Sequence, residues 1–114
     1  MTSILMPWPD KLLSPNAVAH WGTKAHLKKI QKSAWHVLAL NAHGIRGATK
    51  FRMTFHPPDR RIRDMDNIIA SMKSAIDGLA LAAHVDDSQF RIEWPTELSE
   101  PIKGGQILVE ILPI

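Results

Sequence analysis

Apolar positions follow strand or helix spacing in six segments of the chain. Four short stretches have the alternation or the β-rich composition of strands: residues 3–6, 49–56, 89–94 and 106–112. Two longer stretches, residues 23–42 and 67–82, repeat apolar residues every three to four positions and therefore predict helices. Thr23 is the expected N-cap of the first helix, and Asp66 or Asn67 that of the second.

This order, β-α-β-α-β-β, predicts a single α/β (α+β) domain over residues 1–114, a four-stranded mixed sheet with two helices on one face. Phe51, Met53 and Phe55 alternate with polar residues and should face the helices. The expected buried face of the first helix consists of its recurring apolar positions and one amide: Leu27, Ile30, Ala34, Val37, Leu38 and Asn41.

Composition narrows the classes of protein that fit. The chain has 114 residues, 45% of them hydrophobic, and no cysteine, which excludes a disulfide scaffold, thiolate catalysis and cysteine-bound zinc. Its apolar runs are too short to span a membrane, and its first ten residues lack a secretory signal, so a cytoplasmic location is expected. The formal net charge of +3 is too small to establish nucleic-acid binding by itself.

The densest group of charged residues lies between the strand predicted over 49–56 and the helix predicted over 67–82. Arg60, Arg61 and Arg63 precede Asp64 and Asp66 there. Two aspartates one residue apart can both face one point, and Mg²⁺ takes one or two protein carboxylates while keeping several waters. The same aspartates also fit helix capping and the helix dipole. Asp86-Asp87 is, by itself, an ordinary turn signal.

In combination these motifs resemble the RusA-type Holliday-junction resolvases of bacteria and phages. The resemblance rests on DRRIRDMDN at 59–67, a helix with Asp77 near its end, and VDDSQ at 85–89. Pro7-Trp8-Pro9, His20-Trp21 and Lys103-Gly104-Gly105 extend it along nearly the whole chain. The family pattern implies a Mg²⁺-dependent nuclease, with Mn²⁺ as a substitute, of phage or prophage origin.

The resemblance also implies roles for individual residues. Asp64, Asp66 and Asp87 match the catalytic, Mg²⁺-binding aspartates, and Asp86 matches an auxiliary acid beside them. The family's functional lysine falls on Ala70, and Lys73, three residues further along, is the candidate replacement. Among the expected DNA contacts, the resemblance implies Arg63. Arg60 and Arg61 are expected from their clustered charge, Lys28 and Lys32 from their i, i+4 spacing with Lys24, and Trp21 from its capacity to stack on a base. Trp21 also fits core or dimer packing, and the lysines also fit a solvated surface.

The sequence therefore predicts a nuclease that resolves four-way DNA junctions by paired symmetric incisions, with a homodimer matching the two-fold symmetry of the DNA. A branched-DNA-binding protein that does not cut, and a structural oligomerising protein whose aspartates only cap helices, remain alternatives. One geometric question stays open. A helix over 67–82 is about 24 Å long and carries the chain away from Asp64. Three arrangements would still bring Asp87 near Asp64. An extended segment after the helix leads the chain back, or the helix is shorter, or the partner subunit contributes its own Asp87.

Overall fold

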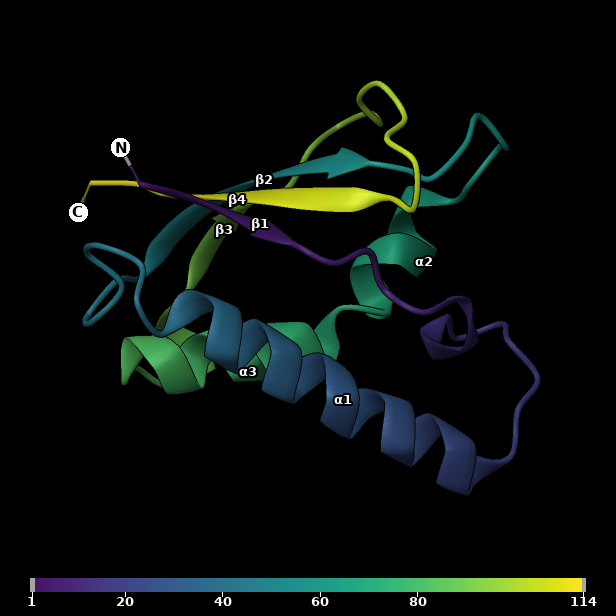
Figure 1. Ribbon diagram of the computed structural model, residues 1–114, viewed down its shortest axis with the longest axis horizontal. Coiled ribbons are helices and arrows are strands. Elements are labelled where there is room, and N and C mark those ends of the chain that lie inside the picture. Colours follow the sequence, from purple (N-terminus) through teal and green to yellow (C-terminus); the bar gives the residue numbers. More distant parts are fainter. Residues whose placement is uncertain (1, 114) are drawn as a thin grey trace.

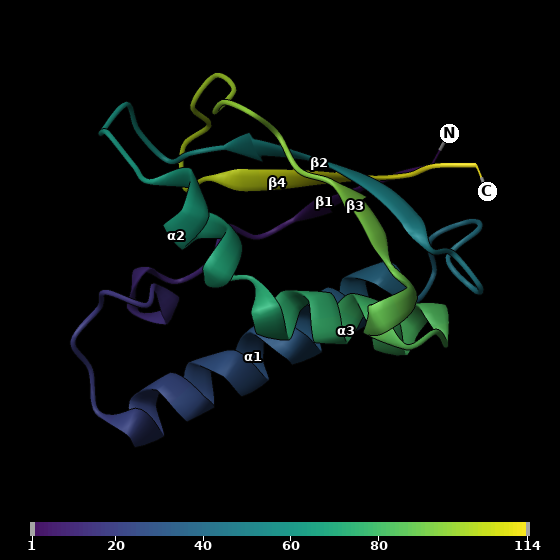
Figure 2. The same ribbon diagram turned by 180° about the vertical axis from the view of Figure 1, so that it is seen from behind.

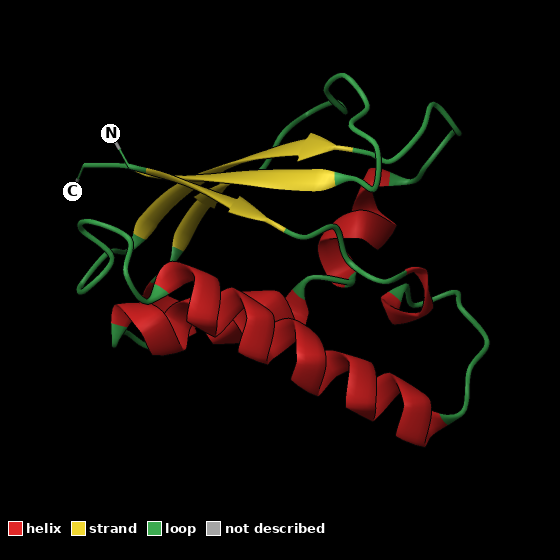
Figure 3. Cartoon of the chain, viewed as in Figure 1, coloured by secondary structure: helices red, strands yellow, loops and turns green. Residues whose placement is uncertain are grey.

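The computed structural model describes residues 2–113 and places helices on one face of a four-stranded sheet (Figures 1 and 3). The strands are β1 (Ser3–Met6), β2 (Lys50–His56), β3 (Arg91–Glu93) and β4 (Gln106–Ile111). The helices are α1 (Trp21–Ala39), α2 (Met65–Ala70) and α3 (Lys73–Ala83), with 3-10 turns η1 (Lys11–Leu13) and η2 (Asp87–Gln89). The predicted α+β class and strand number are confirmed.

The sheet is mixed, as predicted, and its strand order is β1-β4-β2-β3. β4 is antiparallel to both of its neighbours and pairs Val109 with Ile4 on one side and with Met53 on the other. β3 is parallel to β2, and a parallel pair requires a crossover connection. α2 and α3 lie in that crossover, on the face of the sheet that is turned downward in Figure 2.

The core lies between the helices and the covered face of the sheet. Phe51, Met53 and Phe55 of β2 are almost completely buried, which confirms the predicted alternation. Trp35 of α1 and Leu79 of α3 close over them with no exposed surface. Other core side chains come from β1, β4 and α3, namely Ile4, Met6, Ile107, Val109, Ala75 and Ala82.

The predicted buried face of α1 is wrong. Gln31, Trp35 and Ala39 face the core, whereas Ile30 and Val37 are 51% and 59% exposed. The amide of Gln31 can be buried because it finds hydrogen-bond partners, which removes most of the cost of desolvating it. The helix also begins at Trp21, two residues before the expected cap, and ends at Ala39 rather than at residue 42. His20 caps α1, because its ring nitrogen Nδ1 accepts a hydrogen bond from Gly22 N–H.

The second predicted helix is in fact two helices, α2 and α3, separated at Ser71 and Met72. Ser71 Oγ donates to the carbonyl of Ile68 at 2.6 Å, and Met72 N–H bonds Ile69, three residues back, which tightens the last turn. Gln31 Nε2 donates to the Ser71 carbonyl at 2.9 Å and to Ser74 Oγ at 2.8 Å. These contacts from α1 hold the bend between α2 and α3.

One further expectation is corrected, and Gly78 gains a structural explanation. The strand expected over 89–94 is shorter because Asp87–Gln89 forms η2. Gly78, which interrupts the apolar pattern of the second helical segment, marks the closest approach of α1 and α3. A Cβ at that position would clash with the Lys32 carbonyl oxygen, so the glycine allows the two helices to touch.

Gln31→Ala tests the hydrogen bonds at the bend. We expect the free energy of unfolding to fall by about 2–3 kcal/mol, since the buried Ser71 carbonyl and Ser74 hydroxyl lose their donor. Urea denaturation followed by circular dichroism measures the change. Lys29→Ala, at an exposed position of the same helix, is the control. It should change the free energy of unfolding by less than about 0.5 kcal/mol. A Gln31→Ala loss no larger than that of the control would contradict this role.

Candidate nucleic-acid interface

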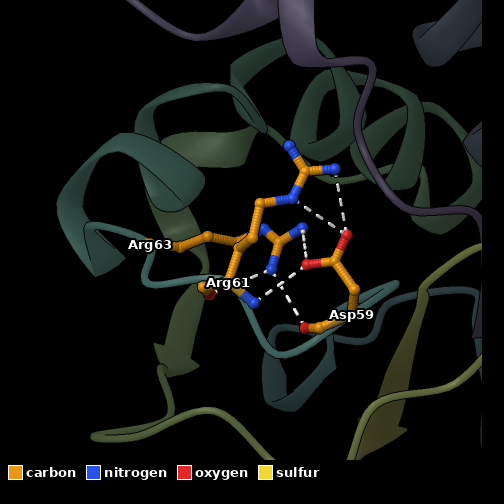
Figure 4. A network of polar contacts seen from close by, with 3 residues as sticks. All are labelled: Asp59, Arg61 and Arg63. Atoms are coloured by element: carbon orange, nitrogen blue, oxygen red, sulfur yellow. Dashed lines mark hydrogen bonds and ion pairs between the residues drawn. The ribbon is translucent and has the colours of Figure 1, made fainter.

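The arginine loop after β2 is organised by one carboxylate. Asp59 accepts from Arg61 N–H at 2.9 Å and pairs with both the Arg61 and Arg63 guanidinium groups (Figure 4). Arg63 Nη1 also donates to the carbonyls of Asp59 and Arg61, and its side chain is only 19% exposed. Arg63 is therefore fixed inside the loop, whereas the Arg61 side chain stays exposed.

Asp59 and Glu100 partly neutralise the positive charge of the arginine loop. Hydrogen bonds from the Arg61 backbone and from the Arg63 and Arg61 side chains lower the pKa of Asp59, so this carboxyl is ionised at neutral pH. Arg60 pairs with Glu100 at 3.1 Å. Both Arg60 and Arg61 remain largely exposed, and exposed ion pairs are weak. These two arginines can therefore exchange their carboxylates for phosphates.

Asp64 and Asp66 lie together at the start of α2. Asp64 is the N-cap and its Oδ1 accepts from Asp66 N–H at 2.9 Å, the capping role that the sequence left open as an alternative. Capping occupies only one of its two oxygens. Asp66 lies in the first turn and is exposed, and within residues 2–113 its carboxylate has no hydrogen bond or ion pair.

The second acidic pair lies beyond α3 at η2. Asp86 caps this turn by accepting from Ser88 N–H at 2.9 Å, and hydrogen bonds from Ser88 lower its pKa. Asp87 accepts from Lys73 Nζ at 3.0 Å, and Lys73 also reaches Asp77 at 3.3 Å. The hydrogen bond that Lys73 donates to Asp87, and then the one that it donates to Asp77, raises the pKa of Lys73. Lys73 thus connects the first turn of α3 to η2.

Asp64 and the second acidic pair line separate hollows. Asp64 lines one of about 220 Å³ together with Asp10, Lys11 and Asn67, whereas Asp86 and Asp87 line another of about 490 Å³ beside α3. Among the described residues of one chain, no three acidic or histidine side chains are grouped to hold a metal ion. The open geometric question is answered in part: the helix is shorter than expected, and Asp87 lies beside α3 rather than grouped with Asp64.

A lysine-lined groove of about 520 Å³ adjoins both hollows. It shares Ser14 with the Asp64 hollow, and Lys32 and Asp77 with the Asp87 hollow. Its walls are one side of α1 and the first residues of α3, and they carry five lysines and one carboxylate, Lys24, Lys28, Lys29, Lys32, Lys73 and Asp77. We call this the lysine groove. Sequence spacing indicated the α1 lysines, but only the tertiary fold adds Lys73 to them.

Trp21, the remaining expected DNA contact, is 77% exposed and starts α1. It belongs to no core cluster in residues 2–113, and its ring lies beside that of His20. Asp10 and Lys11 also line the Asp64 hollow, although the sequence did not single them out because residues 10–22 show no regular spacing of apolar positions. The sequence feature that could have indicated a turn here is Asp10, a helix-capping residue type. In the structure Asp10 accepts from Leu12 N–H and caps η1.

The donor chemistry of Asp64 and Asp66 is compatible with Mg²⁺. Both carboxylates are exposed, Asp66 is unpaired in the described chain, and Asp64 keeps a free oxygen. Mg²⁺ is held by one or two carboxylates with waters and substrate phosphates, so a third protein ligand is not required. If Mg²⁺ binds, these two side chains are the ones that would hold it.

Comparison with known proteins gives one relationship along the whole chain. An uncharacterized protein of Xylella fastidiosa, strain Temecula1, is 33% identical over 120 aligned positions, which cover all of this chain and 78% of the relative. The two proteins belong to one family. No family model matches the chain. Among its described residues, no helix is both long and apolar enough to cross a bilayer.

The pH titration of Asp59 tests the arginine loop. Because hydrogen bonds to the ionised form lower its pKa, the contribution of Asp59 to stability is present at neutral pH and is lost as pH falls through that lowered pKa. We expect NMR titration to place Asp59 below the ordinary range of aspartates, and Arg63→Ala to move it upward. Arg60→Ala, whose partner is Glu100, should leave it unchanged. An Asp59 midpoint that neither variant moves would contradict the loop geometry.

Proposed function

We propose that this protein is a Mg²⁺-dependent endodeoxyribonuclease that binds branched DNA along the lysine groove and resolves four-way junctions by paired symmetric incisions. The observation that carries the proposal is the lysine groove, with five cations against one carboxylate, between the Asp64 hollow and the Asp87 hollow. A polyanion suits the groove, and the exposed acids at either end suit a divalent cation.

The dimensions of the groove are compatible with a nucleic-acid strand. Lys24, Lys28 and Lys32 follow one another at i, i+4 spacing on α1, which spreads their charges over about 12 Å. That length corresponds to the axial rise of roughly three to four nucleotides of one strand. The lysines would therefore contact consecutive phosphates and direct the backbone toward the acidic residues.

The acidic residues would supply the cutting site. Bound Mg²⁺ would polarise the scissile phosphate, activate a water and stabilise the leaving oxygen. Asp66 offers an unpaired carboxylate in the described chain, and Asp64 offers the oxygen that capping leaves free. The rigid start of α2 holds both in place, and the Asp59 contacts hold the loop that leads to them.

Lys73 is well placed to replace the lysine that the resemblance predicts at position 70. Ala70 at the end of α2 and Lys73 at the start of α3 line the same groove, on either side of the bend, so the Lys73 ammonium would serve the same part of the groove as a lysine at position 70. Its pair with Asp87 is exposed and therefore weak. A phosphate in the groove can take the place of Asp87 as the partner of Lys73.

One observation favours a second candidate, a branched-DNA-binding protein that does not cut. Asp87 is held by Lys73, and the described part of a single chain groups no three metal-ligating side chains. This candidate uses the same groove and predicts DNA binding without cleavage. Metal-dependent nicking distinguishes the two.

Cleavage of a synthetic four-way junction is the direct test. We expect nicked products with Mg²⁺ and none with EDTA. Asp66→Asn should lower the rate on the order of 100-fold or more, because it removes a ligand charge, while junction binding stays equal or becomes tighter. Glu97→Gln, which removes an exposed acid elsewhere, is the matched control and should cut normally. Binding without any Mg²⁺-dependent cleavage would favour the second candidate.

The salt dependence of binding tests the groove itself. Each phosphate contact contributes about 0.9 to the slope of log affinity against log salt, so Lys28→Ala/Lys32→Ala should reduce that slope by roughly 2. Fluorescence anisotropy with a labelled junction measures it. Arg46→Ala/Lys103→Ala removes the same charge from exposed positions outside the groove and should leave the slope nearly unchanged. If both double variants reduced the salt-dependence slope equally, DNA binding would not be specific to the lysine groove.

A further inference from the structure

The Asp64 hollow lies between two segments that are far apart in sequence. One wall comes from residues 8–14, which follow β1, and the other comes from residues 63–71, which include α2. Figures 1 and 2 show these two segments side by side. The hollow has a volume of about 220 Å³. Drug-sized ligands occupy pockets of roughly 300–1,000 Å³, so this space suits a single ring system rather than a whole nucleotide.

Trp8 lines the hollow, and two contacts fix its position. Its ring meets that of Phe55 nearly at a right angle, with the ring centroids 6.1 Å apart. Gly105 approaches so closely that a Cβ there would lie 2.6 Å from Trp8 Cβ, and its φ of +75° also favours glycine. Residues 7–9 and 103–105, two motifs to which the sequence assigned no role, therefore meet at this wall. A fixed aromatic wall suits a flat ligand that can stack on it.

The charges around the hollow disfavour a phosphate as its occupant. Two cations, Lys11 and Arg63, are matched by two carboxylates, Asp10 and Asp64. Arg63 is moreover paired with Asp59 and bonded to two carbonyls. The lysine groove, in contrast, carries five cations against one carboxylate. A phosphate is therefore attracted to the groove, whereas the balanced charges of the hollow suit an uncharged ligand.

Asn67 supplies a polar group that can recognise such a ligand. It lies in α2, lines the hollow and is partly buried. Within residues 2–113 its side-chain amide makes no hydrogen bond, so its donors and its acceptor remain available. The edges of nucleobases present donors and acceptors in patterns that differ from base to base, and an asparagine can pair with two of them at once. Asn67 can therefore distinguish one base from another.

We propose that the Asp64 hollow binds one nucleobase of the strand that lies in the lysine groove, with the base stacked on Trp8 and its edge read by Asn67. Ser14 lines both the hollow and the groove. The phosphates of the strand therefore stay on the lysines while one base turns aside into the hollow. Bases at a branch point are suited to this because a base that is already unpaired costs least to turn out of the stack.

This base would determine where the strand is cut. Asp64 lines the same hollow, so the recognised base lies beside the phosphate at the candidate metal site. Asn67 is then a specificity-determining residue that touches the base next to the cut. The DNA strand as the source of the base rests on the proposed function, whereas the fit of the hollow to an uncharged heterocycle does not.

NMR titration with the four deoxynucleosides of DNA tests the hollow without DNA or metal. At millimolar concentration, at least one of them should shift the Trp8 indole N–H and Asn67 side-chain amide signals, whereas inorganic phosphate should shift the lysines of the groove instead. Asn67→Leu keeps the size of the side chain but removes its hydrogen-bonding groups. It should raise the dissociation constant of the bound deoxynucleoside about tenfold or more.

Asn41→Leu is the matched control for Asn67→Leu. Asn41 is exposed after the end of α1 and lines neither the hollow nor the lysine groove, so this variant should bind the deoxynucleoside normally. Circular dichroism verifies that both variants are folded. If no deoxynucleoside shifts the Trp8 and Asn67 signals of the wild-type protein, or if phosphate shifts them equally, the proposal is overturned.

Base substitution in a synthetic four-way junction gives a second readout. Changing one base pair at a time around the crossover should alter the rate of cleavage by about tenfold or more at one position of each cut strand. Asn67→Leu should remove most of that difference, and a variant that keeps the full base preference would overturn the proposal. Deoxynucleoside binding in the hollow without any cleavage of DNA would contradict the proposed function and leave the nucleobase site standing.

Discussion

The hydrogen bonds of Gln31 hold the bend on which the lysine groove depends. Its amide, buried in α1, donates to the Ser71 carbonyl and to Ser74 Oγ, and so holds the bend between α2 and α3. Without the bend, residues 67–82 would extend as one helix. With it, the start of α3 lies against α1, and Lys73 lines the same groove as the α1 lysines. One buried amide therefore connects the fold to its most basic surface.

The charged residues of the site combine structural and chemical roles. Asp64 and Asp86 each cap a turn, and Asp59 holds the arginine loop in place. Each capping aspartate bonds the N–H two residues ahead through a single oxygen, so capping and metal binding are compatible at Asp64. The exposed Lys73 ammonium is held by two partly exposed carboxylates that a phosphate can replace. Local stability and the proposed ligand binding can therefore use the same side chains without conflict.

Sequence reasoning succeeded where local pattern decides structure. Alternation in β2 predicted the burial of Phe51 and Phe55 because one face of the sheet is covered. It failed on α1, because hydrophobicity favoured Ile30 and Val37 over Gln31. The partners that allow Gln31 to be buried lie about 40 residues away in sequence. The break at Ser71 has no glycine or proline to signal it, and the Lys73–Asp87 contact depends on the path of the chain after α3.

The central claim is that the start of α2 binds a divalent cation beside a groove for DNA. Titration of the full-length protein with Mn²⁺, followed by NMR, measures this directly because paramagnetic broadening is strongest near the bound ion. The account predicts that the amide signals of Asp64 and Asp66 broaden first, and that excess Mg²⁺ restores them. Broadening that begins equally at unrelated exposed acids such as Glu97, or that Mg²⁺ does not reverse, would contradict it.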